Sequence, residues 1–214
     1  LAMLPLVVGI FTTSIAAGRR MSRTGRYRMY PIVGATVTAV ALVLLSTLDN
    51  SSPYWFAGVS MYVMGLGLGL TMQVLIVVVQ NSVDRSDMGV ATASVAFFRQ
   101  MGGAFGTALF GAILTSRLAV HLTDAMQEAP AGTPPAAVGS PETMANDVQA
   151  IQALPGPLQD LVTGAFSSAL HDMFLSAVPL VLVALGVAFF IKEVPLAARQ
   201  EPAPVHVPEQ DRIG

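Results

Sequence analysis

The sequence predicts an all-α integral membrane protein with about five transmembrane helices. Of its 214 residues, 53% are hydrophobic and only 11% are charged, with a mean hydropathy of +0.64, whereas about a quarter of the residues of a soluble domain are charged. The charged residues gather between long apolar runs, as in chains that cross a bilayer. These runs lack the strict apolar–polar alternation of membrane barrel strands, so helices are the expected spanning form.

Five apolar segments are long enough to cross a bilayer, which takes about 20 residues of helix. The first covers residues 1–18. It starts within an apolar run at Leu1, with neither an initiator Met nor a basic segment, so we expect an N-terminal truncation rather than a signal peptide. The other four cover residues 30–48, 54–79, 89–116 and 173–191.

The connections between these spans differ in length and composition. Residues 117–168 form a long connection, expected to lie outside the cytoplasm and to contain short amphipathic helices over about residues 142–154 and 158–170. The last residues, 193–214, are rich in proline and are predicted to be a disordered cytoplasmic tail.

Basic residues predict the orientation of the spans, because loops rich in Arg and Lys stay in the cytoplasm. Only Arg117 lies on one side of the predicted spans, and Arg99 lies within the fourth. The C-terminus is therefore expected in the cytoplasm, and the protein is expected to be a multi-pass protein of the bacterial cytoplasmic membrane. The other basic residues all lie on the cytoplasmic side: Arg19, Arg20, Arg23, Arg26, Arg28, Arg85, Lys192, Arg199 and Arg212.

Several function classes find no support in the sequence. The chain has no cysteine, which excludes disulfides, thiolate metal sites and cysteine nucleophiles. Its net charge of -2 provides no basic field for nucleic acid. It also lacks a phosphate loop, a His-Glu-x-x-His motif and a nucleophile elbow. We therefore expect no enzyme, cofactor, metal site or nucleic-acid partner, and we expect membrane lipids as the surroundings.

The first predicted cytoplasmic loop is the most distinctive motif, and it reads GRRMSRTGRYR from Gly18. One interpretation is a topological signal that also attracts anionic lipid headgroups. The other is a gate latch, in which arginines pair with a carboxylate or a helix C-terminus. Gly18, Arg23, Gly25 and Arg26 resemble the cytoplasmic loop motif of the major facilitator superfamily, with Ser22 where that family often has an aspartate.

The resemblance extends over about residues 1–192. Residues 65–73, 80–81, 89–93 and 98–106 are similar to fourteen-helix drug:proton antiporters, the EmrB/QacA-like branch of that superfamily. The resemblance implies that the five spans form most of the C-terminal half of a major facilitator fold. It also implies that nine helices precede them, an odd number that agrees with the orientation predicted from charge.

The function implied by this resemblance is proton-coupled secondary active transport. Such a protein would export drugs or other amphipathic, often cationic, small molecules across the cytoplasmic membrane. Its partners would be the small-molecule substrate, protons and the missing N-terminal half of the same transporter. Two alternatives stay open: an exporter of amino acids, lipids or a self-made antibiotic, and a non-transporting five-helix membrane subunit or scaffold.

Polar residues within the spans are candidates for the transport cavity or for coupling. A charge at the bilayer centre costs about 2.5–3.5 kcal/mol, so Arg99 either lines the cavity or is accommodated by snorkelling or a structural ion pair. The amides either contact substrate or bond to neighbouring helices. The full set of candidates is Arg99, Gln73, Gln80, Asn81, Thr71 and Met72.

Two further sets of residues complete the prediction. His171 and Asp172 lie at the expected outer mouth of the fifth span, either as an interfacial pair or with a role in proton release. Glycines in rows of small residues spaced four apart allow helices to approach closely in lipid, either for static packing or for sliding during alternating access. These glycines are Gly65, Gly69, Gly102, Gly103, Gly106 and Gly111.

Overall fold

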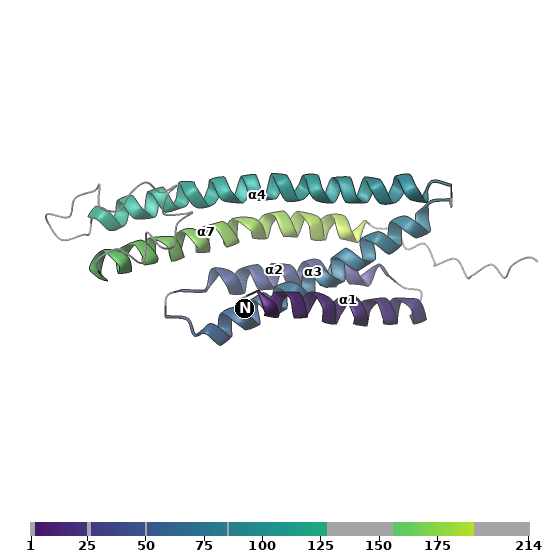
Figure 1. Ribbon diagram of the computed structural model, residues 1–214, viewed down its shortest axis with the longest axis horizontal. Coiled ribbons are helices and arrows are strands. Elements are labelled where there is room, and N and C mark those ends of the chain that lie inside the picture. The colour runs from purple at the N-terminus through teal and green to yellow at the C-terminus, as the bar shows by residue number, and fades with distance from the viewer. Residues whose placement is uncertain (1–2, 25–26, 50, 85, 128–155, 191–214) are drawn as a thin grey trace, which may run out of the picture.

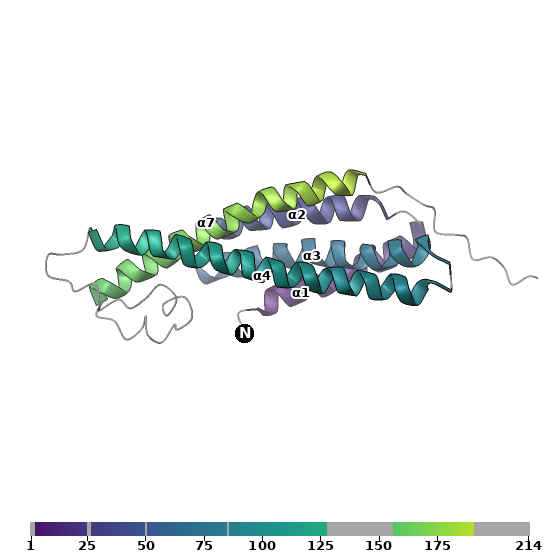
Figure 2. The same cartoon turned by 90° about the horizontal axis from the view of Figure 1, so that it is seen from above.

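A computed structural model describes residues 3–24, 27–49, 51–84, 86–127 and 156–190, and in these ranges it contains five α-helices. Consecutive helices run antiparallel, and all lie along one long axis (Figures 1 and 2). The predicted all-helical fold is thus confirmed. The amphipathic helix expected at 142–154 and the tail at 193–214 lie outside the described residues. The helices are α1 (Leu4–Thr24), α2 (Met29–Ser46), α3 (Tyr54–Ser82), α4 (Met88–Gln127) and α7 (Gly156–Phe189).

Four of these helices contain a stretch long and apolar enough to span a membrane: Met29–Ser46, Tyr54–Ile76, Met88–Gln127 and Leu158–Phe189. Helix α1 is not among them. It stays helical through Thr24, so its last turns carry arginines that the sequence predicted to lie in a loop. Arginine is a good helix former, and cations are favourable near a helix C-terminus, which explains this continuation. The crossing of the membrane by α1 stays a prediction.

Helix α3 lies at the centre of the tightest packing, with α1 and α2 on two of its faces. A Cβ added at Gly65 or Gly69 would collide with α1. In the same way, a Cβ added at Gly9 of α1 would collide with the backbone of α3. On another face, Gly67 of α3 packs against Gly34 of α2. Glycine is required at these positions because any side chain would force the backbones apart.

The other contacts are unequal. Helix α7 packs along both α2 and α4, whereas α3 and α4 touch only sparsely. Helix α4 has just two buried side chains among its described residues, Leu118 and Leu122. It is therefore the least enclosed of the described helices.

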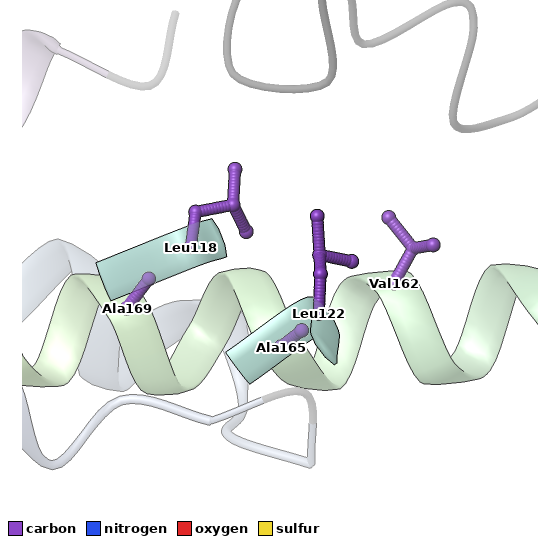
Figure 3. Close-up of a cluster of buried hydrophobic side chains, with 5 residues drawn as sticks. All are labelled: Leu118, Leu122, Val162, Ala165 and Ala169. Atoms are coloured by element: carbon purple, nitrogen blue, oxygen red, sulfur yellow. The ribbon is translucent and has the colours of Figure 1, made fainter. Parts of the chain in front are cut away.

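Helices α4 and α7 extend beyond α1, α2 and α3 at one end of the bundle (Figures 1 and 2). With 40 and 34 residues, they are about 60 and 51 Å long, well over the roughly 30 Å of a bilayer core. The projecting part has an apolar core of its own, in which Leu118 and Leu122 of α4 lie against the face of α7 that carries Val162, Ala165 and Ala169 (Figure 3). We call this end of the bundle the hairpin end.

The opposite end, where α1 ends and α2 begins, is here called the arginine end. Tyr27 is fully buried there and packs with Met21 of α1 and Val74 of α3. Next to it, an Nη2 atom of Arg28 donates a hydrogen bond to the carbonyl of Phe189, the last residue of α7, at 2.9 Å. The connection from α1 to α2 is thus fixed to both α3 and α7.

Candidate functional site

An apolar cleft of about 450 Å³ opens between α3 and α4. Its α3 wall consists of Met72, Leu75, Ile76 and Val79. A smaller cavity of about 140 Å³ shares Ile76, Val79, Val95 and Arg99 with it, so the two are parts of one space. We call this space the Arg99 cleft. Its position follows from the sparse contact between α3 and α4.

The α4 wall of the cleft carries its only charged side chain among the described residues. Arg99 lies with Ala91, Ser94, Val95 and Phe98 along the larger cavity. It is eleven residues beyond Met88, or about 16 Å along the helix, which is close to half the thickness of a bilayer core. Within the part of the chain that the structure describes, Arg99 takes part in none of the ion pairs.

The hydroxyl groups of the cleft are already engaged by their own helix. The Oγ1 of Thr92 donates to the Met88 carbonyl at 2.8 Å, and the Oγ of Ser94 donates to the Val90 carbonyl at 2.9 Å. Such bonds to the preceding turn satisfy a hydroxyl within an apolar helix. The guanidinium of Arg99 is therefore the principal polar group that the described walls offer to a ligand.

The structure separates the other predicted cavity residues. Met72 lines the cleft, but its neighbour Thr71 donates to the Gly67 carbonyl at 3.1 Å and lies against Gly34 of α2. The side chains of Gln73, Gln80 and Asn81 lie outside the described part of α3. A turn of about 100° per residue accounts for the different directions of residues 71 and 72.

The predicted glycines fall into two groups. Gly65 and Gly69 are buried between α3 and α1. By contrast, a Cβ added at any of the predicted α4 glycines would meet no atom of the described residues within 4 Å. The α4 face that they form is open in this structure. These glycines are Gly102, Gly103, Gly106 and Gly111.

The loop motif at the arginine end is described in part. Gly18 has no described atom within 4 Å of the position of an added Cβ, and Arg23 is exposed on the last turn of α1. Gly25 and Arg26 lie outside the described residues. The anchor that the structure does show, Arg28 on the C-terminal carbonyl of α7, was not singled out from the sequence. A cation there interacts favourably with the helix dipole.

A polar cluster at the hairpin end joins α2, α4 and α7. The Oδ2 of Asp172 lies 3.0 Å from the Nε2 of His121 and 3.8 Å from the Nε of Arg117. His171 contacts α2 instead, with its Nδ1 2.6 Å from the carbonyl oxygen of Ser46. A carbonyl only accepts, so the Nδ1 of His171 carries the proton. The two neighbouring residues of α7 thus hold different helices.

Sequence reasoning missed His121 and Arg117, which lie on α4 and meet Asp172 across 51 and 55 residues of chain. The sequence did contain one signal: Arg117 and His121 are four residues apart, so they share a face of one helix. An open cavity of about 400 Å³ lies beside this cluster and is also lined by Asp49. Hydrogen bonds from the side chains of Ser52 and Ser51 lower the pKa of Asp49, so this carboxylate stays ionised at neutral pH.

Comparisons with known proteins give a consistent result. Residues 8–212 match the family model described as fungal trichothecene efflux pump (TRI12). An uncharacterised MFS-type transporter of Mycobacterium tuberculosis is 37% identical over 196 residues, which cover 92% of this chain and 27% of that relative. The multidrug transporter protein MdtP of Bacillus subtilis is 36% identical over 57% of this chain and 22% of its own length. A tetracycline resistance determinant of Streptomyces rimosus is 26% identical over 95% of this chain and 63% of its own. The chain thus spans about a quarter of the length of the first of these relatives.

Proposed function

Because the chain belongs to the MFS transporter family of multi-pass membrane proteins, we propose that it is the C-terminal part of a proton-coupled exporter of drugs or other amphipathic small molecules. The finer assignment, to the fourteen-helix drug:proton antiporters, rests on the motifs of residues 65–73 and 98–106. The relatives named above include efflux and resistance proteins, which supports export as the direction of transport.

The observation that carries this proposal is the Arg99 cleft. Its walls are apolar apart from Arg99, which lies about 16 Å from the start of α4 within the candidate membrane span of that helix. Ligand sites are mostly apolar concave spaces of about 300–1,000 Å³ with a few polar groups. The apolar body of a substrate would be held by Met72, Ile76 and Phe98, while Arg99 would fix its orientation.

Alternating access requires one part of the bundle to move against another. The glycine contacts hold α1, α2 and α3 closely together, whereas α4 touches α3 sparsely. Displacement of α4 relative to α3 would therefore open or close the Arg99 cleft with little loss of contact between these two helices. The described carboxylates other than Asp172 lie near helix ends or in turns, and Asp172, midway along α7, is engaged by His121 and Arg117. We assign the proton-carrying acid to the N-terminal half of the transporter.

We place the arginine end of the bundle in the cytoplasm, since nine of the eleven basic residues lie on that side of the predicted spans. The absence of cysteine makes this testable by labelling single introduced cysteines in intact cells. A cysteine at Ser52 should react with a membrane-impermeant maleimide, whereas one at Ser86 should react only after the cells are opened. The reverse pattern would refute the orientation.

Efflux itself is tested with the full-length gene in a host that lacks its own drug exporters. We expect lower ethidium accumulation with the transporter than with an empty vector, and we expect a protonophore to abolish the difference. A set of cationic, neutral and anionic dyes extends the assay. If the correctly inserted protein transports none of them, the proposal of drug export is wrong.

A further inference from the structure

The charge pattern of the Arg99 cleft points to a class of substrate. The described walls combine apolar side chains with one guanidinium, and no aspartate or glutamate among these residues lines either cavity. The hydroxyls of Thr92 and Ser94 donate to their own backbone and need no ligand to satisfy them. The site therefore offers an apolar surface and one fixed positive charge.

We propose that the Arg99 cleft binds organic anions: amphipathic molecules with an apolar body and a carboxylate, sulfonate or phenolate group. This inference rests on the proposed export function and adds the charge of the substrate to it. It differs from the cationic compounds that the family resemblance suggested, because a cation in this space would face Arg99 without a compensating acid on the described walls.

The energetics favour an anion at this position. A guanidinium is costly to hold near the centre of a bilayer, and an anionic group bound to it neutralises that charge through charge-assisted hydrogen bonds. The apolar walls strengthen the attraction between the two charges, since electrostatic interactions are less screened there than in water. The cleft has a volume of about 450 Å³, which is within the usual range of ligand sites and large enough for a molecule of two or three aromatic rings.

A structural ion pair and snorkelling are the alternatives to anion binding at Arg99, and each predicts a different result. If Arg99 forms a structural ion pair with the rest of the transporter, its removal should impair every substrate and the abundance of the protein alike. If the long side chain snorkels along the Arg99 cleft to the arginine end, its removal should not lower the transport of any one substrate more than that of the others. Only an anion-binding role makes the loss depend on the charge of the substrate.

A matched pair of dyes separates these cases. The anion 8-anilinonaphthalene-1-sulfonate and the neutral N-phenyl-1-naphthylamine share one aromatic skeleton and differ by the sulfonate. Transport is measured with the full-length protein in inverted membrane vesicles, relative to vesicles without it, and ethidium serves as a cationic reference. The variants are Arg99→Gln, Arg99→Lys and, as a control on the same helix, Gln100→Ala, which lies outside the described cleft lining.

We expect Arg99→Gln to lower transport of the sulfonate dye about tenfold or more, the loss of one charge-assisted hydrogen bond, and to change that of the neutral dye less than about twofold. Arg99→Lys should retain part of the anion transport, because the charge remains without the planar fork. Gln100→Ala should resemble the wild type. Membrane abundance, measured on the same vesicles, normalises every rate.

Equal losses for both dyes, or no loss for either, would overturn the inference. So would transport of ethidium, but of neither naphthalene dye, by the wild-type protein, and in that case the export function would stand. If Arg99→Gln does not reach the membrane, the Arg99→Lys variant decides, since a uniform loss for both dyes would contradict anion binding. Failure of the wild type to transport any of the three dyes would instead refute the proposed export function, and the inference with it.

Discussion

Replacement of Gly65 by alanine tests the close packing of α1 on α3. A Cβ at this position would overlap the carbonyl oxygen of Leu6 and lie only 3.0 Å from the carbonyl carbon of that residue and 3.1 Å from the Cα of Gly9. These atoms belong to the backbone of α1, so no side-chain rotation relieves the collision. The two helices must move apart.

The cost has two opposing parts. Helix propensity favours alanine over glycine by about 1 kcal/mol. Against it, a separation of roughly 0.5–1 Å forfeits about a quarter to a half of the dispersion energy of each contact along the seam. Overpacking of this kind typically costs about 1–3 kcal/mol. Because the α1–α3 seam also includes Gly9 and Gly69, we expect a net destabilisation of about 1–2 kcal/mol.

The assay is the thermal unfolding of the purified protein in detergent. Unfolding is measured as the loss of the monodisperse species on size-exclusion chromatography after heating. Gly186→Ala on α7 is the matched control, because an added Cβ there meets no described atom within 4 Å and gains the same helix propensity. We expect a lower unfolding temperature for Gly65→Ala and an equal or higher one for Gly186→Ala. Equal temperatures for the two variants would refute the close approach of α1 and α3.

Three further predictions concern the ends of the bundle. Leu118→Ala removes a fully buried side chain from the apolar core of the hairpin end and should lower the free energy of unfolding by about 2–5 kcal/mol, measured as faster proteolysis of that end. The control is Leu109→Ala, at a position 47% exposed, which should have little effect. Equal rates of proteolysis for the two variants would contradict the apolar core. Arg28→Gln removes the cation from the C-terminus of α7 and should cost about 0.3–1 kcal/mol, measured as faster amide exchange in its last turn; unchanged exchange would count against the contact. Asp172→Asn weakens the partner of His121, and a loss under about 1–2 kcal/mol is expected because the carboxylate is part-exposed; thermal unfolding measures it, and a larger loss would mean that Asp172 has other partners.

The order of the helices follows from the sequence because apolar run length is a strong signal in membrane proteins. Helices α2, α3 and α4 overlap the segments predicted at 30–48, 54–79 and 89–116. The predicted boundaries fail where a helix leaves the apolar region. Polar residues after Ser116 suggested a loop, yet the seam of Leu118 and Leu122 continues the helix at four-residue spacing. Periodicity, rather than mean hydropathy, carries that information.

Some residues of the candidate site could be predicted from the sequence, and others could not. Arg99 stood out from the sequence because a charge in an apolar span is costly, whatever its neighbours. The contact between His121 and Asp172 did not stand out from the sequence, because it depends on how α4 and α7 pack against each other. The same holds for the bond from Arg28 to the end of α7, which spans 161 residues of chain. Partners set by tertiary packing are outside the reach of local pattern.

The distribution of glycines along the chain connects the packing of the bundle to the position of the cleft. Glycines of α3 meet glycines of α1 and α2, and these contacts bring three backbones together. The glycines of α4 meet no described atom, and α4 touches α3 only sparsely. A cleft therefore forms along α4 rather than along α1 or α2. Because Arg99 lies on this least enclosed helix, whatever covers α4 determines how far its charge is removed from water. Under the proposed function, Arg99 would make transport depend on the charge of the substrate, and the comparison of Arg99→Gln with Arg99→Lys measures how much of anion transport depends on the positive charge at this position.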